Sequence, residues 1–225
     1  ENQAAKSYED YQVFSAIPST SSNILFKNII KENDFVNYFK YQYLYNGGGV
    51  GLADINNDGL LDIYFISNME TNKLYLNKGN FEFEDITQQS GAGGSRGWST
   101  GVSMADVNGD GWIDIYVCNS GEIDGDDKRN ELFINNGDLT FAEKALTYGL
   151  DDPGYSIHGA FFDYDKDNDL DFYLGNNSYK AIGSFDLRKN LRTNRDSLGA
   201  DKLFRNDGDS FTDVSEEAGI YGSII

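Results

Sequence analysis

The stretch Asp54–Asp62, with the sequence DINNDGLLD, recurs twice along the chain, as DVNGDGWID in Asp106–Asp114 and as DYDKDNDLD in Asp163–Asp171. Each copy places oxygen-bearing side chains at positions 1, 3, 5 and 9 and a turn-forming residue at position 6. Ca²⁺ takes about six to eight oxygen ligands, and one short loop can supply several of them. Three copies in the same register exclude chance acidity on a surface turn and predict three calcium sites.

Every acidic loop lies within a longer unit of short strands. The first aspartate recurs at Asp54, Asp106 and Asp163, an interval of roughly 50 residues. Apolar and aromatic runs flank each loop, and two more runs follow, joined by Asn-x-Gly turn signals. Such units are typical of four-stranded β-propeller blades. The predicted strands are 49–53, 62–66, 72–79 and 81–87, then 101–105, 114–118, 130–137 and 140–144, then 158–162, 171–175, 201–208 and 210–215.

We therefore expect an all-β fold of propeller blades, each made of four antiparallel strands. Residues 23–30 resemble the closing strands of the units, and in a ring the N-terminal strand often completes the last blade. Because propellers have about four to eight blades, we expect these three to be part of a larger ring of about seven. The expected divisions are an N-terminal extension 1–22, a closing strand of the last blade with its lead-in 23–46, and blades at 47–94, 95–150 and 151–225.

Two insertions lengthen the repeat. Residues 119–129 add an acidic loop to the second blade. Residues 178–200 lengthen the third blade with a stretch that suits a short helix. Each insertion is either a solvated face or a contact surface, and the sequence leaves both interpretations open. The basic residues noted in the second insertion are Arg188, Lys189, Arg192 and Arg195.

The composition excludes several classes of protein. A net charge of −19 argues against nucleic acid as a partner, because phosphate binding needs clustered Lys and Arg. The 14% of aromatic residues argues against an acidic disordered chain, since such chains are poor in aromatics. No apolar run approaches the roughly 18 residues of a transmembrane segment. Cys118 is the only cysteine, so we expect no intrachain disulfide and a small, buried, apolar side chain.

The acidic loop begins like an EF-hand or dockerin loop but ends differently. Those loops need an acidic residue at position 12, which in the EF-hand is a bidentate carboxylate on a helix. Position 12 here is Phe65, Val117 or Leu174, each inside a predicted strand. The last acidic residue comes at position 9, where that strand begins. The loop is therefore predicted to be a strand-to-strand turn.

The motifs around the loops resemble the FG-GAP or VCBS repeat, which forms the blades of integrin-α-like propellers. They are more similar still to the branch that includes ASPIC/UnbV-containing and cartilage acidic proteins. The resemblance covers about residues 23–219 and implies a Ca²⁺-binding propeller that is secreted or displayed on the cell envelope. The motifs that carry it are Tyr45–Val50, Ala53–Gly59, Leu74–Gly79, Phe83–Thr87 and Ser215–Gly219.

Carried onto this sequence, the resemblance implies one Ca²⁺ ion per loop, about three in total. The ligands are the side chains at positions 1, 3, 5 and 9 and the backbone carbonyl at position 7. The third loop has Asp165 where the others have Asn, so on charge count it should bind most tightly. It also has Asn168 at position 6, and Asn is the next-best residue after Gly at positive φ. The implied ligands are Asp54, Asn56, Asp58, Leu60 and Asp62, then Asp106, Asn108, Asp110, Trp112 and Asp114, then Asp163, Asp165, Asp167, Asp169 and Asp171.

The function expected from these features is that of a calcium-rigidified scaffold, not an enzyme, that contacts a protein or glycan partner, for example in a cell-envelope complex. The open faces of its end blades need further blades or a partner to cover them. Extracellular fluid holds enough calcium to fill weak sites. We therefore expect an extracellular or outer-surface location, with a lipid anchor upstream of this chain as one arrangement.

Two alternatives stay open. Propellers host polysaccharide-active hydrolases and lyases, and paired carboxylates can act as acid and base. Against an enzyme, the obvious carboxylates are committed to metal, and His158, Trp98 and Tyr155 lie at repeat-framework positions. The second alternative is a set of Asx-stabilised turns without metal. Against it, four or five crowded carboxylates repel one another unless a cation lies among them.

Overall fold

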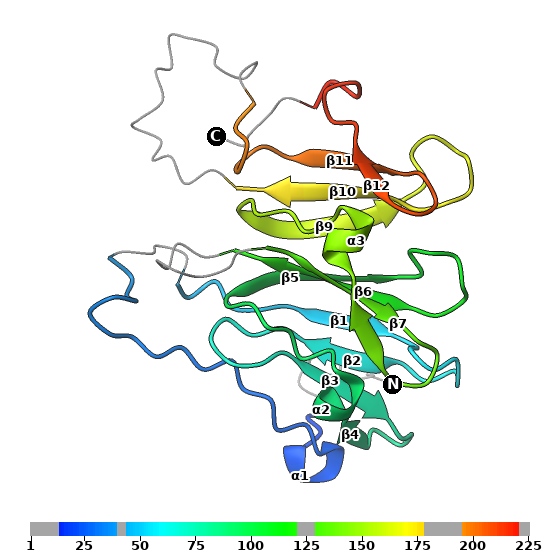
Figure 1. Ribbon diagram of the computed structural model, residues 1–225. Coiled ribbons are helices and arrows are strands. Elements are labelled where there is room, and N and C mark those ends of the chain that lie inside the picture. Colours follow the sequence, from blue (N-terminus) through cyan, green and yellow to red (C-terminus); the bar gives the residue numbers. More distant parts are fainter. Residues whose placement is uncertain (1–13, 40–43, 121–128, 178–194, 221–225) are drawn as a thin grey trace, which may run out of the picture.

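The computed structural model describes residues 14–39, 44–120, 129–177 and 195–220, which form three four-stranded antiparallel sheets (Figure 1). Each sheet contains four strands that are consecutive in the chain, as in propeller blades, so the predicted all-β architecture is confirmed. Blade 1 comprises β1 (Val50–Ala53), β2 (Asp62–Phe65), β3 (Lys73–Asn77) and β4 (Phe83–Asp85). Blade 2 comprises β5 (Ser99–Ala105), β6 (Asp114–Asn119), β7 (Glu131–Asn135) and β8 (Phe141–Glu143). Blade 3 comprises β9 (Ser156–Phe162), β10 (Asp171–Asn176), β11 (Lys202–Asn206) and β12 (Phe211–Asp213).

The first two strands of every blade pair antiparallel, so each acidic loop closes a hairpin. The position-12 residues lie within the second strand of their blade, which confirms a strand-to-strand turn instead of an EF-hand helix. The residues that flank the loops are paired in one register: Ala53 with Asp62, Ala105 with Asp114, and Phe162 with Asp171.

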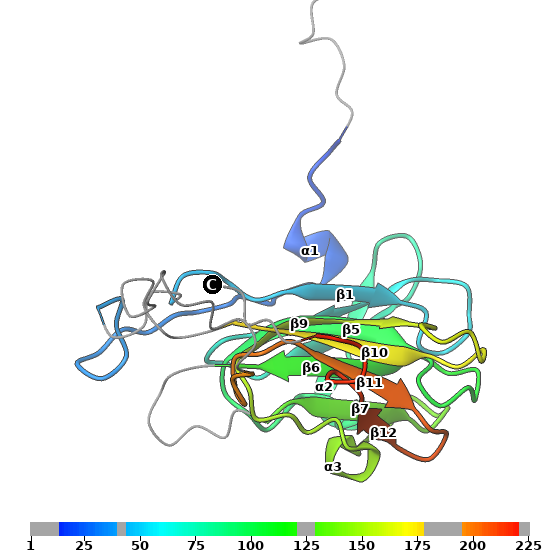
Figure 2. The same cartoon turned by 90° about the horizontal axis from the view of Figure 1, so that it is seen from above.

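The blades stack face to face in chain order, with β1 beside β5 and β5 beside β9 (Figure 1). Seen from above, these first strands run along one side of the stack, whereas β12 and α3 (Ala145–Tyr148) lie toward the other (Figure 2). An apolar cluster fills each interface, and burying one large apolar side chain contributes about 1.5–3 kcal/mol. Blades 1 and 2 share Ile55, Tyr64, Ile66, Leu74, Val102, Ile115, Val117 and Phe133, and blades 2 and 3 share Val107, Tyr116, Cys118, Leu132, Phe172, Leu174 and Phe204.

In blades 1 and 2, a tyrosine on the second strand binds the linker to the next blade. Tyr64 donates its hydroxyl hydrogen to the carbonyl oxygen of Ala92 (2.6 Å), and Tyr116 donates to that of Leu150 (2.9 Å). Both tyrosines are fully buried. A buried hydroxyl needs such a partner, so these bonds fix the path of the linker.

We expect Tyr116→Phe to destabilise the fold by about 1–3 kcal/mol, because it leaves the buried Leu150 carbonyl without its donor. The amide of Asn130 also loses an acceptor, since its Nδ2 donates to the Tyr116 hydroxyl (2.9 Å). The matched control is Tyr173→Phe, whose hydroxyl donates to Asp201 at a half-buried site and should cost less. Urea unfolding measures both variants, and equal losses would contradict the expectation.

Two predicted framework positions and the lone cysteine behave as expected. The Trp98 carbonyl accepts the N–H of Ser120, and the Tyr155 carbonyl accepts that of Asn177, both at 2.9 Å. The two aromatic residues thus make the same contact in successive blades. Cys118 is fully buried in the cluster between blades 2 and 3, and burial raises the pKa of its thiol.

The N-terminal segment lies on the face of blade 1 that points away from blade 2. Phe26 stacks on Phe65 with ring centroids 4.8 Å apart, and alternate side chains over residues 23–31 are half-buried and exposed. The segment is thus extended, as a closing strand would be, but it pairs with no strand among the described residues. Val50 and Leu52 on the same face stay 55% and 57% exposed.

Short helical turns occur that the repeat pattern did not predict. They are α1 (Ser19–Ser22), α2 (Thr87–Ser90) and α3, and the last two end at left-handed Gly91 and Gly149. Across the part of the chain that the structure describes, no helix has the length and hydrophobicity to traverse a bilayer. Most of the two predicted insertions, 121–128 and 178–194, lies outside the described residues, and residues 195–200 form turns without a helix.

Candidate metal centre

The three acidic loops gather at one edge of the stack, where β1, β5 and β9 turn into β2, β6 and β10 (at the right in Figure 1). All the predicted ligands lie in these loops or at the first residue of the strand that follows. Positions 1, 3 and 5 are exposed or half-buried, whereas the aspartate at position 9 is fully buried. The first two loops also touch, since Asn57 Nδ2 donates to the Gly111 carbonyl oxygen (3.0 Å).

The aspartate at position 9 fastens each loop to the rest of its blade. In blade 2, Asp114 accepts the N–H of Val107 at Oδ2 (2.9 Å) and the N–H of Asn135 at Oδ1 (2.8 Å). Val107 is position 2 of the loop, and Asn135 ends the third strand. A carboxylate oxygen has two lone pairs, so each can accept this bond and still face a cation. Equivalent bonds of 2.7–3.0 Å join Asp62 to Ile55 and Asn77, and Asp171 to Tyr164 and Asn206.

In the first two loops, the amide at position 3 offsets part of the crowded negative charge. Asn56 Nδ2 donates to Asp58 Oδ2, and Asn108 Nδ2 donates to Asp110 Oδ2, both at 2.9 Å. The amide oxygen of the same residue accepts the N–H of position 5 at 3.2 Å in the first loop and 3.1 Å in the second. In these two loops, the carboxylate and amide oxygens therefore accept hydrogen bonds from donors within the same loop.

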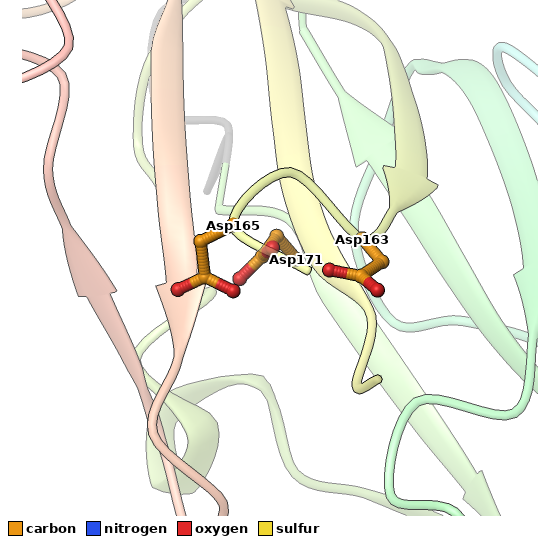
Figure 3. Close-up of side chains that lie close together, drawn as sticks. All are labelled: Asp163, Asp165 and Asp171. Carbon is orange, nitrogen blue, oxygen red and sulfur yellow. The ribbon is translucent and has the colours of Figure 1, made fainter. Parts of the chain in front are cut away.

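The third loop has no such amide, and its carboxylates come closest together. Asp163, Asp165 and Asp171 each offer one oxygen within 4.8 Å of the others (Figure 3). Among the described residues, no other group of three acidic side chains brings its oxygens this close together. Asp169 Oδ1, in the same loop, is shielded from solvent and has no hydrogen-bond partner. An orphaned carboxylate oxygen in a loop where three other carboxylates crowd together is an arrangement that a cation compensates.

Burial and crowding raise the pKa values of several loop carboxyls. Removal from water raises the pKa of Asp114 to about 6, although two backbone N–H bonds lower it. Removal from water and then the charge of Asp167 raise the pKa of Asp169 to about 6. The pKa of Asp165 is raised by the same loss of water and by the charges of Asp167 and Asp171. These shifts are the electrostatic cost of holding the carboxylates together.

Two left-handed residues shape each loop. At position 6, Gly59, Gly111 and Asn168 have φ of 85°, 89° and 78°, so Asn168 adopts the positive φ that was expected of an Asn in place of Gly. Position 4 is left-handed as well, which the sequence did not reveal because Lys166 is an unusual residue at positive φ. The position-4 residues are Asn57, Gly109 and Lys166, with φ of 58°, 72° and 69°.

The donor chemistry of the loops fits a hard divalent cation. Every predicted side-chain ligand offers oxygen, and no predicted ligand offers the nitrogen or sulfur that Zn²⁺ and Cu²⁺ favour. The orphaned Asp169 oxygen and the close group of three carboxylates fit Ca²⁺ best in the third loop.

The structure also shows a role for the asparagine at the end of the third strand, which the sequence analysis overlooked. Asn135 Nδ2 donates to the Ile55 carbonyl oxygen (2.9 Å), and Asn206 Nδ2 donates to that of Val107 (3.3 Å). Each acceptor is position 2 of the loop in the preceding blade. The signal was the recurrent Asn of the Asn-x-Gly turns, which we interpreted as a turn former alone. The turn role is also present, since Asn135 Oδ1 accepts the N–H of Gly137 (2.9 Å).

Four-stranded blades with an acidic loop between the first and second strands define a propeller-like repeat protein. Residues 54–117 match the model of the FG-GAP-like repeat, so the chain carries a repeat of that type, as its motifs predicted.

The chain is also similar to cartilage acidic protein 1. It is 29% identical to the Xenopus tropicalis protein over 142 residues, which cover 61% of this chain and 21% of that protein. It is 26% identical to the Homo sapiens protein over 150 residues, which cover 66% and 22%. The chain thus spans about a fifth of the length of these relatives.

Proposed function

We propose that this protein is a calcium-stabilised β-propeller scaffold that presents its surface to a protein or glycan partner. The observation that carries the proposal is the third loop, where three carboxylates offer oxygens within 4.8 Å of one another. Such a group is costly alone and favourable around a cation. The repeat of its pattern in the first two loops extends the proposal to about three Ca²⁺ ions.

The proposed ligands are the loop side chains at positions 1, 3, 5 and 9 with the carbonyl at position 7. The side chains at positions 1, 3 and 5 would supply ligands from the loop itself. The buried position-9 aspartate would add a ligand through the same carboxylate that binds position 2 and the end of the third strand. When bound, calcium supplies positive charge that neutralises the loop and stabilises the folded state by mass action.

An extracellular or cell-surface location supports this role, because calcium there is abundant enough to fill weak sites. The relatives are named cartilage acidic protein 1, and a protein of cartilage fits the same setting. We propose a non-catalytic role, since the loops use their carboxylates as ligands and His158 lies on a strand at a repeat position.

Charge count predicts that the third loop binds calcium most tightly. We expect Asp165→Asn to weaken the strongest phase of a calorimetric calcium titration on the order of tenfold, because it removes one ligand charge. The matched control is Asp209→Asn, which removes the same charge from the exposed β11–β12 turn and should leave that phase unchanged. The reciprocal variant Asn56→Asp should strengthen the first loop. An unchanged strongest phase in Asp165→Asn would contradict the assignment.

The enzyme alternative is tested separately, on a panel of polysaccharides. We expect no turnover with or without calcium. Turnover that disappears when a carboxylate outside the three loops is replaced would contradict the scaffold proposal.

A further inference from the structure

A single run of hydrogen bonds links the acidic loops of all three blades. Between loops 2 and 3, Val107 is held on both sides of its peptide: its N–H donates to Asp114 (2.9 Å) and its carbonyl accepts from Asn206 Nδ2 (3.3 Å). Asn206 in turn donates its own N–H to Asp171 (2.9 Å). One asparagine therefore connects the position-9 aspartates of two neighbouring blades.

The same connection exists between loops 1 and 2. Ile55 donates its N–H to Asp62 (3.0 Å), and its carbonyl accepts from Asn135 Nδ2 (2.9 Å). Asn135 donates its N–H to Asp114 (2.8 Å). Asp114 thus receives bonds that lead to both neighbours.

The whole run is buried, which makes each of its bonds consequential. The three aspartates are fully buried, and Ile55, Val107, Asn135 and Asn206 are no more than 5% exposed. Hydrogen bonds in such a setting are not replaced by water, so a shift at one end is passed on to the next partner. The position-2 side chains also pack within the clusters between blades.

We propose that Asn135 and Asn206 are positioning residues that couple the acidic loops of neighbouring blades, so that a cation held in one loop strengthens the binding of a cation in the next. This inference rests on the proposed calcium function. The N–H of each asparagine binds the position-9 aspartate of its own blade, and its Nδ2 holds the position-2 peptide whose N–H binds the position-9 aspartate of the preceding blade. An aspartate oriented toward a cation in one loop would therefore restrain the equivalent aspartate in the next. Because coupling between binding sites is reciprocal, each loop should influence the other equally.

The chain contains a natural control for this role. Asn77 ends the third strand of blade 1, and its Nδ2 donates to the Leu61 carbonyl within the same blade (2.8 Å). Its Oδ1 accepts the N–H of Gly79 (2.9 Å), as Asn206 Oδ1 accepts that of Gly208 (3.0 Å). Asn206 Nδ2 likewise donates to the Leu170 carbonyl within blade 3 (3.2 Å). Asn77 therefore shares the turn contact and the contact within its own blade, and in the described residues it has no bond to a preceding loop.

The experiment compares Asn206→Ala with Asn77→Ala in a titration with Tb³⁺, a luminescent substitute for Ca²⁺. Trp112 lies in the second loop and sensitises an ion bound there, and Trp112→Phe identifies that part of the emission. We expect Asn206→Ala to weaken binding at the second loop roughly three- to tenfold, as the loss of one buried hydrogen bond predicts. Asn77→Ala should leave it unchanged. The backbone N–H bonds to Asp171 and Asp62 remain in both variants.

The outcomes separate the two proposals. Equal second-loop affinity in Asn206→Ala and Asn77→Ala, with normal binding by the wild-type protein, would overturn the coupling and leave the calcium function intact. Absence of saturable Tb³⁺ and Ca²⁺ binding in the wild-type protein would overturn both.

A second measurement does not depend on the stability of an asparagine variant. In calcium, Asp106→Asn/Asp110→Asn empties only the second loop. We expect the N–H of Asn206 in blade 3 to exchange with deuterium faster in this variant than in the wild-type protein. An unchanged exchange rate at Asn206 would contradict the coupling.

Discussion

We expect the chelation of calcium to lower the midpoint of thermal unfolding by on the order of 15 °C or more. A ligand at a hundred times its dissociation constant stabilises the folded state by about 2.7 kcal/mol per site, so three sites contribute about 8 kcal/mol. For a chain of this size, each kcal/mol moves the midpoint by about 2–4 °C. Differential scanning calorimetry with EGTA, and then with excess Ca²⁺, measures the effect.

Magnesium provides the control for this experiment. Mg²⁺ needs a compact octahedral site and gives up its waters reluctantly, so we expect it to restore little of the lost stability at equal concentration. A melting midpoint that is the same with EGTA and with calcium would contradict a structural role for the metal.

Replacing a buried position-9 aspartate has the second largest expected effect. Asp114→Ala leaves the N–H groups of Val107 and Asn135 without acceptors in a buried site. Each unsatisfied buried donor costs about 1–3 kcal/mol, so we expect a loss of about 2–6 kcal/mol even in EGTA. Asp110→Ala removes a proposed ligand that is exposed, and in EGTA it should cost no more than about 0.5 kcal/mol.

The comparison in calcium completes the test. There we expect both variants to lose the stabilisation by the second ion as well, so Asp110→Ala should also become costly. Urea unfolding of the two variants with and without calcium therefore separates the structural role of position 9 from its role as a ligand. Equal stability of both variants in EGTA would contradict the structural role of Asp114.

Much of the fold could be predicted from the repeat. The acidic loop marks the turn between the first two strands, and the apolar position 12 excludes a helix after it. Apolar and aromatic runs joined by Asn-x-Gly turns then predict the third and fourth strands, which the structure has at Lys73–Asn77 and Phe83–Asp85 in blade 1. These features are local, so the sequence carries them directly.

The contacts between blades could not be predicted in the same way. Asn206 and Val107 are 99 residues apart, and nothing local indicates that the amide of one reaches the carbonyl of the other. The second role of the position-9 aspartate was hidden for the same reason, since it depends on the N–H of a distant strand end. Lys166 concealed the left-handed backbone at position 4 because its side chain gives no sign of it.

Counting the metal tests the calcium proposal most directly. The protein is dialysed to equilibrium against buffered Ca²⁺, and the bound calcium is measured by elemental analysis. We predict about three ions per wild-type chain and about two when the second loop carries Asp106→Asn/Asp110→Asn, since each loop supplies one site. A calcium content at background level, or one that is unchanged in that variant, would contradict the proposal that these loops are calcium sites.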